Sequence, residues 1–251
     1  MVKIGLILTT DGKIWNGKKK LEKFFRGRFQ SADDTIEYQL IYAKYDDLPD
    51  PSMFSEYAGF AFSGSYHSVN DGFKWIENLE RFVLQIHEYN KIIENKPVNL
   101  FGICFGHQLI AKAFGGAVRP VKQGFIFCCE EIEVTNQLSN KPWYRETLGH
   151  ASSFRISQIH GEEVVEVPSN ATKVGHSKSC RNEAFVYGDH IFTLQGHPED
   201  RQSELRVTKG GYMVKHMGMS HMELENILNH AHNLDSDILM KMCVSFLTHN
   251  L

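Results

Sequence analysis

One cysteine of this chain lies in a run that suits a nucleophile. Residues Gly102–Gln108 read Gly-Ile-Cys-Phe-Gly-His-Gln and follow an apolar segment. A nucleophile between two glycines, where a strand meets a helix, is typical of a sharp turn that exposes the nucleophilic side chain. The helix start favours a thiolate, and the next backbone N–H faces the reacting carbonyl. We therefore predict Cys104 as the nucleophile and the Phe105 N–H as an oxyanion donor; the alternative is a small buried apolar cysteine.

A thiol nucleophile needs a base, and the base needs a group that orients it. Residues Gln195–Glu199 read Gln-Gly-His-Pro-Glu and follow the apolar run Ile191–Leu194. Residues two apart in an extended segment lie on one side, so Glu199 can accept a hydrogen bond from His197 while the other ring nitrogen faces Cys104. The spacing predicts a triad of these three residues. On its own, the run would be read as a surface histidine beside a turn.

A loop of small residues offers a second oxyanion donor. Phe62–Ser68 reads Phe-Ser-Gly-Ser-Tyr-His-Ser. Small residues allow backbone N–H groups to approach an anion closely, so we assign the backbone of Gly64 and Ser65 to this role. The alternative is an ordinary turn between a strand and a helix.

The elements that must position these residues are short apolar runs, which alternate along the chain with segments of helical periodicity. Such alternation is typical of a largely parallel sheet covered by helices on both faces. The helix is clearest over Lys74–Asn90, where apolar residues recur every three or four positions. The expected strands of this half are Lys3–Thr9, Gln39–Ala43, Gly59–Ser63 and Val98–Ile103.

The second half is richer in strands, and we expect a smaller antiparallel layer there. Helices return at Met222–His232 and Ser236–Leu247, the latter with Asp235 or Ser236 as N-cap. The methionines and histidines of Gly210–Met222 are interpreted as lid or packing residues rather than as a soft-metal site. The strands expected in the antiparallel layer are Glu131–Thr135, Thr172–Ser177 and Ile191–Leu194. Residues 1–251 are expected to form one α/β domain with three layers.

The composition excludes several classes of protein. The 251 residues carry a formal net charge of −3, and 42% are hydrophobic. There is no basic excess to indicate a nucleic-acid partner and no apolar run of about 18 residues to span a membrane. Five cysteines without the spacing of a disulfide framework indicate a reducing compartment, so a cytoplasmic location is expected.

With its cysteine elbow and its His-Pro-Glu motif, the chain resembles the class I glutamine amidotransferases, in which cysteine, histidine and glutamate form a triad. The resemblance extends over Ser63–Ser65, Gly115–Val118 and His160–Val164. It implies a flavodoxin-like, doubly wound, mostly parallel sheet with the triad Cys104, His197 and Glu199. It further implies that Gln108 holds the α-carboxylate or the α-amino group of a glutamyl substrate.

Within that superfamily the chain looks most similar to the stand-alone γ-glutamyl peptidases of plants. The similarity rests on the phrasing of Gly102–Ala111 and on Asp189-His190 ahead of the His-Pro-Glu motif. Two departures concern the leaving-group side of the substrate. Ser63–Tyr66 replaces a common Ser-Gly-Gly-Pro, and Lys122–Phe125 lacks a frequent acidic residue. The resemblance implies hydrolysis of γ-glutamyl amides, such as glutamine, glutathione or a conjugate, through a glutamyl thioester, without metal or organic cofactor.

Two rival functions remain open from the residues alone. A glutaminase subunit would pass ammonia to a separate synthetase, although the chain carries no ATP-binding signature such as a P-loop. A non-enzymatic relative would use Cys104 as a redox sensor or would only bind, but such a protein has no need of His197 and Glu199. We expect a γ-glutamyl peptide to be preferred over glutamine, because Tyr66–Ser68 and Phe125–Phe127 offer walls for a bulky leaving group. The alternative is that these aromatic residues are core.

Overall fold

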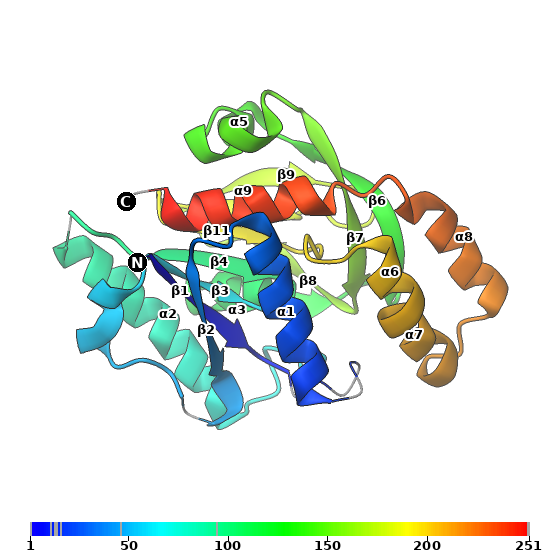
Figure 1. Cartoon of the computed structure of the whole chain (residues 1–251), viewed down its shortest axis with the longest axis horizontal. Coiled ribbons are helices and arrows are strands. Elements are labelled where there is room, and N and C mark those ends of the chain that lie inside the picture. The colour runs from blue at the N-terminus through cyan, green and yellow to red at the C-terminus, as the bar shows by residue number, and fades with distance from the viewer. Residues whose placement is uncertain are drawn as a thin grey trace.

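A nine-stranded mixed sheet forms the centre of the protein, as seen in the computed structural model (Figure 1). The structure describes residues 2–249 except Asp11, Lys13, Ile14, Asn16, Asp46 and Glu94. Within this range the strand order is β2-β1-β3-β4-β11-β10-β9-β6-β7. The strands of this sheet are β1 (Lys3–Leu8), β2 (Glu37–Tyr42), β3 (Gly59–Phe62), β4 (Asn99–Ile103), β6 (Ile126–Val134), β7 (Ser153–His160), β9 (Ala171–His176), β10 (Ala184–Tyr187) and β11 (Ile191–Leu194).

The half of the sheet from β2 to β11 is parallel. All four strands expected in the first part of the sequence occur within two residues of the expected bounds. Strands β3 and β4 are buried along their whole length, which suits a sheet covered on both faces. Their carboxyl ends lead directly to the loop at Gly64 and to Cys104, so the parallel half brings the two motifs to the same edge.

The other half of the sheet is antiparallel, and here the expectation needs correction. The three strands expected in a separate layer all join the main sheet, as β6, β9 and β11, and β11 runs parallel to β4. A separate small antiparallel sheet does exist. It consists of β5 (Ala117–Pro120) and β8 (Glu162–Glu166).

Helices cover both faces of the sheet, which gives the three layers expected from the sequence. Alternate residues of a strand point to opposite faces, and β1 shows this directly. Leu6 belongs to the core cluster beneath α1 and α9, whereas Ile7 belongs to the cluster beneath α2 and α3. The long helices are α1 (Lys18–Ala32), α2 (Lys74–Ile92), α3 (Phe105–Ala113), α8 (His221–Ala231) and α9 (Ser236–Thr248). The short ones are α4 (Asn136–Ser139), α5 (Pro142–Leu148), α6 (Gln202–Glu204), α7 (Gly210–His216), η1 (Ala43–Tyr45) and η2 (Pro51–Glu56).

A third cluster lies at the far end of the sheet, where α7 and α8 stand beside the antiparallel strands (Figure 1). The chain reaches it through a π-helical turn, η3 (Leu205–Lys209). Met213 packs in this cluster against Leu205 and Leu224, so at least this methionine of the Gly210–Met222 segment has the expected packing role. Among the described helices, none has both the length and the apolar character needed to cross a bilayer.

Candidate active site

Cys104 occupies a strained turn between β4 and α3. Its φ is 52° and its ψ is −102°, and within the described ranges it is the only residue other than glycine with a positive φ. The turn is so tight that a Cβ on Gly102 would lie 2.6 Å from the carbonyl carbon of Gly106, and one on Gly106 would lie 2.6 Å from Cβ of Phe62. The two glycines of the motif are therefore required by close packing, and the strained cysteine between them is typical of a nucleophile elbow.

The predicted oxyanion loop packs directly against this turn. A Cβ on Gly64 would lie 2.8 Å from Cε1 of His197 and 3.5 Å from Cβ of Cys104. Ser65 turns its hydroxyl back to donate to the carbonyl of Thr9 at 2.9 Å. Phe105 is the first residue of α3, so its N–H has no partner within the helix. The loop and the elbow therefore pack against each other beside His197.

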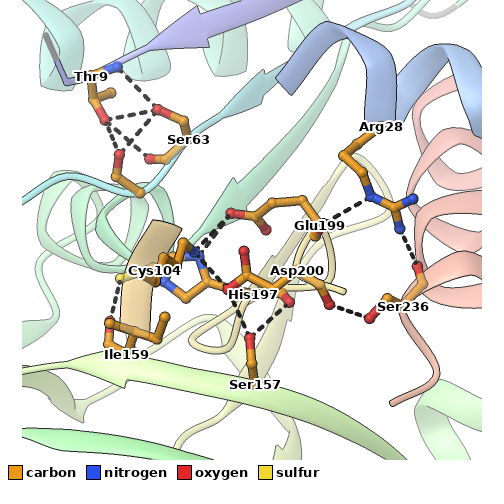
Figure 2. Close-up of polar contacts among 12 residues, drawn as sticks. Thr9, Arg28, Ser63, Cys104, Ser157, Ile159, His197, Glu199, Asp200 and Ser236 are labelled. Atoms are coloured by element: carbon orange, nitrogen blue, oxygen red, sulfur yellow. Dashed lines mark hydrogen bonds and ion pairs between the residues drawn. The ribbon is translucent and has the colours of Figure 1, made fainter. Parts of the chain in front are cut away.

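His197 and Glu199 form a buried ion pair beside the cysteine. The Nδ1 atom of His197 lies 2.8 Å from Oε1 of Glu199, and both side chains are less than a tenth exposed. A carboxylate only accepts hydrogen bonds, so Nδ1 carries the donated proton and Nε2 is left for another partner. Cys104 is close enough to act on this ring, since it raises the pKa of His197. The thiol itself donates to the carbonyl of Ile159 at 3.7 Å, as Figure 2 shows.

The pKa values of this pair move in opposite directions. Burial and the nearby Lys209 ammonium each lower the pKa of His197, but Glu199 and Cys104 outweigh them and raise it to about 10. Burial raises the pKa of Glu199, yet the charges of His197 and Lys209 prevail and hold it below its ordinary value. The imidazole is thus held as an imidazolium against an ionised carboxylate, which is the state that a thiolate nucleophile requires.

Sequence reasoning missed three charged residues that hold the ion pair in place. Arg28, from α1, donates through Nε to the backbone carbonyl of Glu199 at 2.8 Å (Figure 2). Asp200 accepts from the Ser157 hydroxyl at 2.9 Å and from Lys209 at 2.6 Å. Asp200 adjoins the His-Pro-Glu motif and could have been flagged by position. No local signal marks Arg28 or Lys209, which lie 171 and 10 residues from Glu199 in the chain.

A neutral hydrogen-bond network lies on the opposite side of Cys104. The side-chain Nε2 of Gln108 donates to the carbonyl of Glu162 at 2.8 Å and to Oε1 of Gln195 at 3.1 Å. Two further histidines are buried here. His107 bonds the hydroxyl of Thr193 at 2.8 Å, and His160 donates to the Glu162 carbonyl at 3.0 Å. Burial lowers the pKa of His107 to about 3 and that of His160 to about 4, so neither is built as the base.

Two cavities meet at Cys104. The larger measures about 470 Å³, and its lining includes Gln108, His160, Tyr66–Ser68, Phe125 and Met217. The smaller measures about 80 Å³ and lies beside His197 and Glu199, with apolar walls from Trp15, Leu21, Phe24, Phe25 and Met213. Of the aromatic residues expected to line the pocket, Phe127 is instead buried in the cluster beneath α8. Phe125 precedes β6, whereas Phe127 lies within that strand.

In the described part of the chain, no group of three or more His, Cys, Asp or Glu side chains is arranged to hold a metal ion. The groups that the geometry brings together are a thiol, an imidazole and backbone N–H groups, which suit nucleophilic catalysis.

The chain is similar in sequence and fold to known proteins. Two Arabidopsis thaliana proteins are similar: gamma-glutamyl peptidase 4 is 29% identical over 80% of this chain and 77% of the relative, and gamma-glutamyl peptidase 3 is 31% identical over 61% and 58%. A solved structure of a glutamine amidotransferase from Thermotoga maritima shares the fold, with a TM-score of 0.72, 21% identity and 98% of each chain covered. The family model for glutamine amidotransferase class-I matches residues 36–209. The chain belongs to the class I glutamine amidotransferase family.

Proposed function

We propose that this protein is a cysteine hydrolase of γ-glutamyl amide bonds, with Cys104 as nucleophile, His197 as acid and base, and Glu199 as the group that orients it. The observation that carries the proposal is the 2.8 Å pair between His197 and Glu199 beside a cysteine on a strained elbow. Family membership supports the reaction type.

The mechanism follows from the positions of these groups. The Cys104 thiolate attacks the γ-carbonyl carbon, and the resulting oxyanion accepts from the N–H of Phe105 and from the Gly64–Ser65 backbone. The C–N bond then breaks, and the leaving nitrogen takes its proton from His197. A water molecule, deprotonated by the now neutral His197, attacks the glutamyl thioester. Glutamate leaves and the thiolate and imidazolium are restored.

The two cavities suggest how a substrate is oriented. His197 must reach the leaving nitrogen, so the leaving group belongs on the side of the smaller cavity, which His197 lines. The glutamyl portion then lies in the larger cavity, where Gln108 and His160 are found. In this orientation His67, Ser68 and Phe125 line the glutamyl side rather than the leaving-group side expected from the sequence. The Nε2 atom of Gln108 is already committed to Glu162 and Gln195, so its oxygen is the atom available to a ligand. An amide oxygen accepts, and we therefore assign Gln108 to the α-ammonium group rather than to the α-carboxylate.

The preferred substrate in this proposal is a γ-glutamyl peptide or conjugate, not glutamine. The apolar walls around the leaving-group side offer contacts that ammonia cannot use. The similar Arabidopsis proteins are named as gamma-glutamyl peptidases, which supports the same substrate class.

Glutamate release from glutamine, glutathione and a glutathione S-conjugate tests the proposal. Discrimination between substrates is a ratio of kcat/KM values, so each is measured separately. We expect Cys104-dependent release with a higher kcat/KM for glutathione or the conjugate. A preference for glutamine that rises when a synthetase subunit is added would assign the chain to the ammonia-delivering glutaminases instead. Absence of release from all three would refute the hydrolase.

A further inference from the structure

A buried lysine lies against the His197–Glu199 pair. Its Nζ atom is 2.6 Å from Oδ2 of Asp200, 3.3 Å from Nδ1 of His197 and 3.9 Å from Oε1 of Glu199. Lys209 is only 7% exposed, and Asp200 is fully buried. Since Nδ1 of His197 already donates to Glu199, the contact between Lys209 and the ring is a repulsion between two donors rather than a hydrogen bond.

Stability alone does not explain this lysine. Removing two charges from water is costly, and apolar residues of similar volume often stabilise a protein as well as a buried ion pair does. The apolar cluster of Leu205, Met213 and Leu224 lies nearby and could have extended to this position. Lys209 instead ends the π-helical turn η3, and such turns are frequent at functional sites.

Lys209 opposes the other charges that act on His197. Glu199 and Cys104 both favour the imidazolium, and together they would hold its proton tightly. The Lys209 Nζ atom lies 3.3 Å from Nδ1 of this ring, and His160 of β7, whose pKa is lowered to about 4, adds no positive charge. The titratable groups that act on His197 are Cys104 from the elbow, His160 from β7, Glu199 and Asp200 from its own loop, and Lys209 from η3.

We propose that Lys209 is a positioning residue for the triad: its charge, fixed in place by Asp200, weakens the hold of Glu199 and Cys104 on the His197 proton and so makes His197 a better acid. The inference rests on the proposed function, because it concerns the step in which the leaving nitrogen is protonated.

Protonation of the leaving nitrogen determines which substrates should be most sensitive to the loss of Lys209. When the tetrahedral adduct collapses, the C–N bond breaks, its electron pair stays on nitrogen, and nitrogen takes the proton from His197 while sulfur remains bound to the carbonyl carbon. A basic leaving amine depends strongly on a good acid, whereas an electron-poor amine such as p-nitroaniline depends on it less. Loss of Lys209 must therefore slow substrates with basic leaving groups more than substrates with electron-poor ones.

The test uses two γ-glutamyl anilides of nearly the same shape, the p-nitroanilide and the p-methylanilide. Their kcat/KM is measured against pH for wild type, Lys209→Met, Lys209→Arg and Asp200→Asn. In Lys209→Met we expect the basic limb of the profile to move up by one pH unit or more. The ratio of nitroanilide to methylanilide rates should rise severalfold, up to about tenfold, which is the limit that one pKa unit sets. Lys209→Arg should restore both, because the charge is kept.

Asp200→Asn provides the opposite perturbation. It leaves Lys209 without its carboxylate, so the basic limb should move down instead of up. A loosened structure cannot shift the profile in opposite directions, so the pair of variants separates charge from packing. The control is Lys215→Met, which removes an exposed lysine of α7 and should change neither quantity. If Lys209→Met does not fold, the dependence of kcat/KM on pH in Lys209→Arg and Asp200→Asn still tests the role of the Lys209 charge.

An unchanged profile in Lys209→Met and Asp200→Asn, with both anilides slowed equally, overturns the inference and leaves the proposed function standing. Failure of the proposed function looks different, since wild type itself would then show no Cys104-dependent release from either anilide.

Discussion

The two sides of Cys104 are both buried and polar, yet they are built for different tasks. On one side, Glu199, Asp200 and Lys209 surround His197 with charge. On the other side, a neutral network of amides, hydroxyls and histidines surrounds Gln108. Burial acts to lower the pKa of a histidine on each side. The pKa of His197 is nevertheless raised to about 10, whereas that of His107 is lowered to about 3. The two histidines therefore differ in pKa because one has a carboxylate partner, and not because of burial, which they share.

Removal of the nucleophile should have the largest effect on activity. We expect Cys104→Ala to reduce glutamate release by about ten-thousand-fold or more, since the members of a catalytic triad act as a unit. The free energy of unfolding should change by only about 1 kcal/mol, as is usual for a small substitution. Glutamate assays and urea denaturation measure the two quantities. Cys129→Ala is the matched control and should keep full activity; a Cys104→Ala protein with an undiminished rate would disprove the nucleophile assignment.

Removal of the Glu199 charge should lower the pKa of His197 toward the low pKa of His107. In Glu199→Gln the shape is kept, but burial and Lys209 continue to lower the pKa of His197 while the opposing effect of Glu199 is lost and only that of Cys104 remains. We expect a loss in kcat of about a hundred- to ten-thousand-fold, comparable to that for an orienting carboxylate in other triads. The imidazole pKa, followed by NMR, should fall below its wild-type value. Glu225→Gln on α8 loses only an exposed ion pair and should leave both values unchanged.

A change on the neutral side should affect binding more than chemistry. Gln108→Leu removes an acceptor assigned to the substrate α-ammonium, which should raise KM about tenfold, because one such hydrogen bond contributes about 1.4 kcal/mol or somewhat more. The kcat should fall less than threefold. Steady-state kinetics with glutathione separate the two constants, with Gln202→Leu on the surface as control. A fall confined to kcat would place Gln108 on the catalytic side instead.

The smallest effect on activity is expected from Glu183, a carboxyl group within the neutral side. Burial raises its pKa to about 8, despite hydrogen bonds from Ser177 and Gln158 that favour the carboxylate. The folded state therefore binds this proton more tightly than the unfolded chain does, and stability falls as pH rises from about 4.5 to 8, by up to about 1.4 kcal/mol per pH unit.

In Glu183→Gln this dependence should disappear, while turnover at pH 7 stays within about twofold, since the substitution keeps the neutral state of the side chain. Thermal unfolding at pH 5, 6, 7 and 8 measures how stability depends on pH. Glu166→Gln, a substitution at an exposed residue of β8, should show the same pH dependence as wild type. Equal slopes in Glu183→Gln and wild type would show that Glu183 is ionised in the folded protein.

The sequence by itself was sufficient for the parallel half of the fold and for the proposed triad. Strands such as β3 and β4 are apolar throughout, and the cysteine elbow and His-Pro-Glu motif are contiguous, so local chemistry encodes them. Strands β5, β7, β8 and β10 were not predicted. Polar and charged residues run through β7 and β8, and only pairing with β6 and β5 makes those segments extended.

Tertiary structure alone decided what surrounds the triad. Arg28 reaches Glu199 from α1, and Lys209 reaches it from η3, because the sheet brings those helices over the same edge. It also decided that Phe127 packs in the core while Phe125 lines the larger cavity. The physical reason is that a covalent motif fixes its own geometry over a few residues, whereas the field at a buried imidazole is the sum of charges from distant parts of the chain.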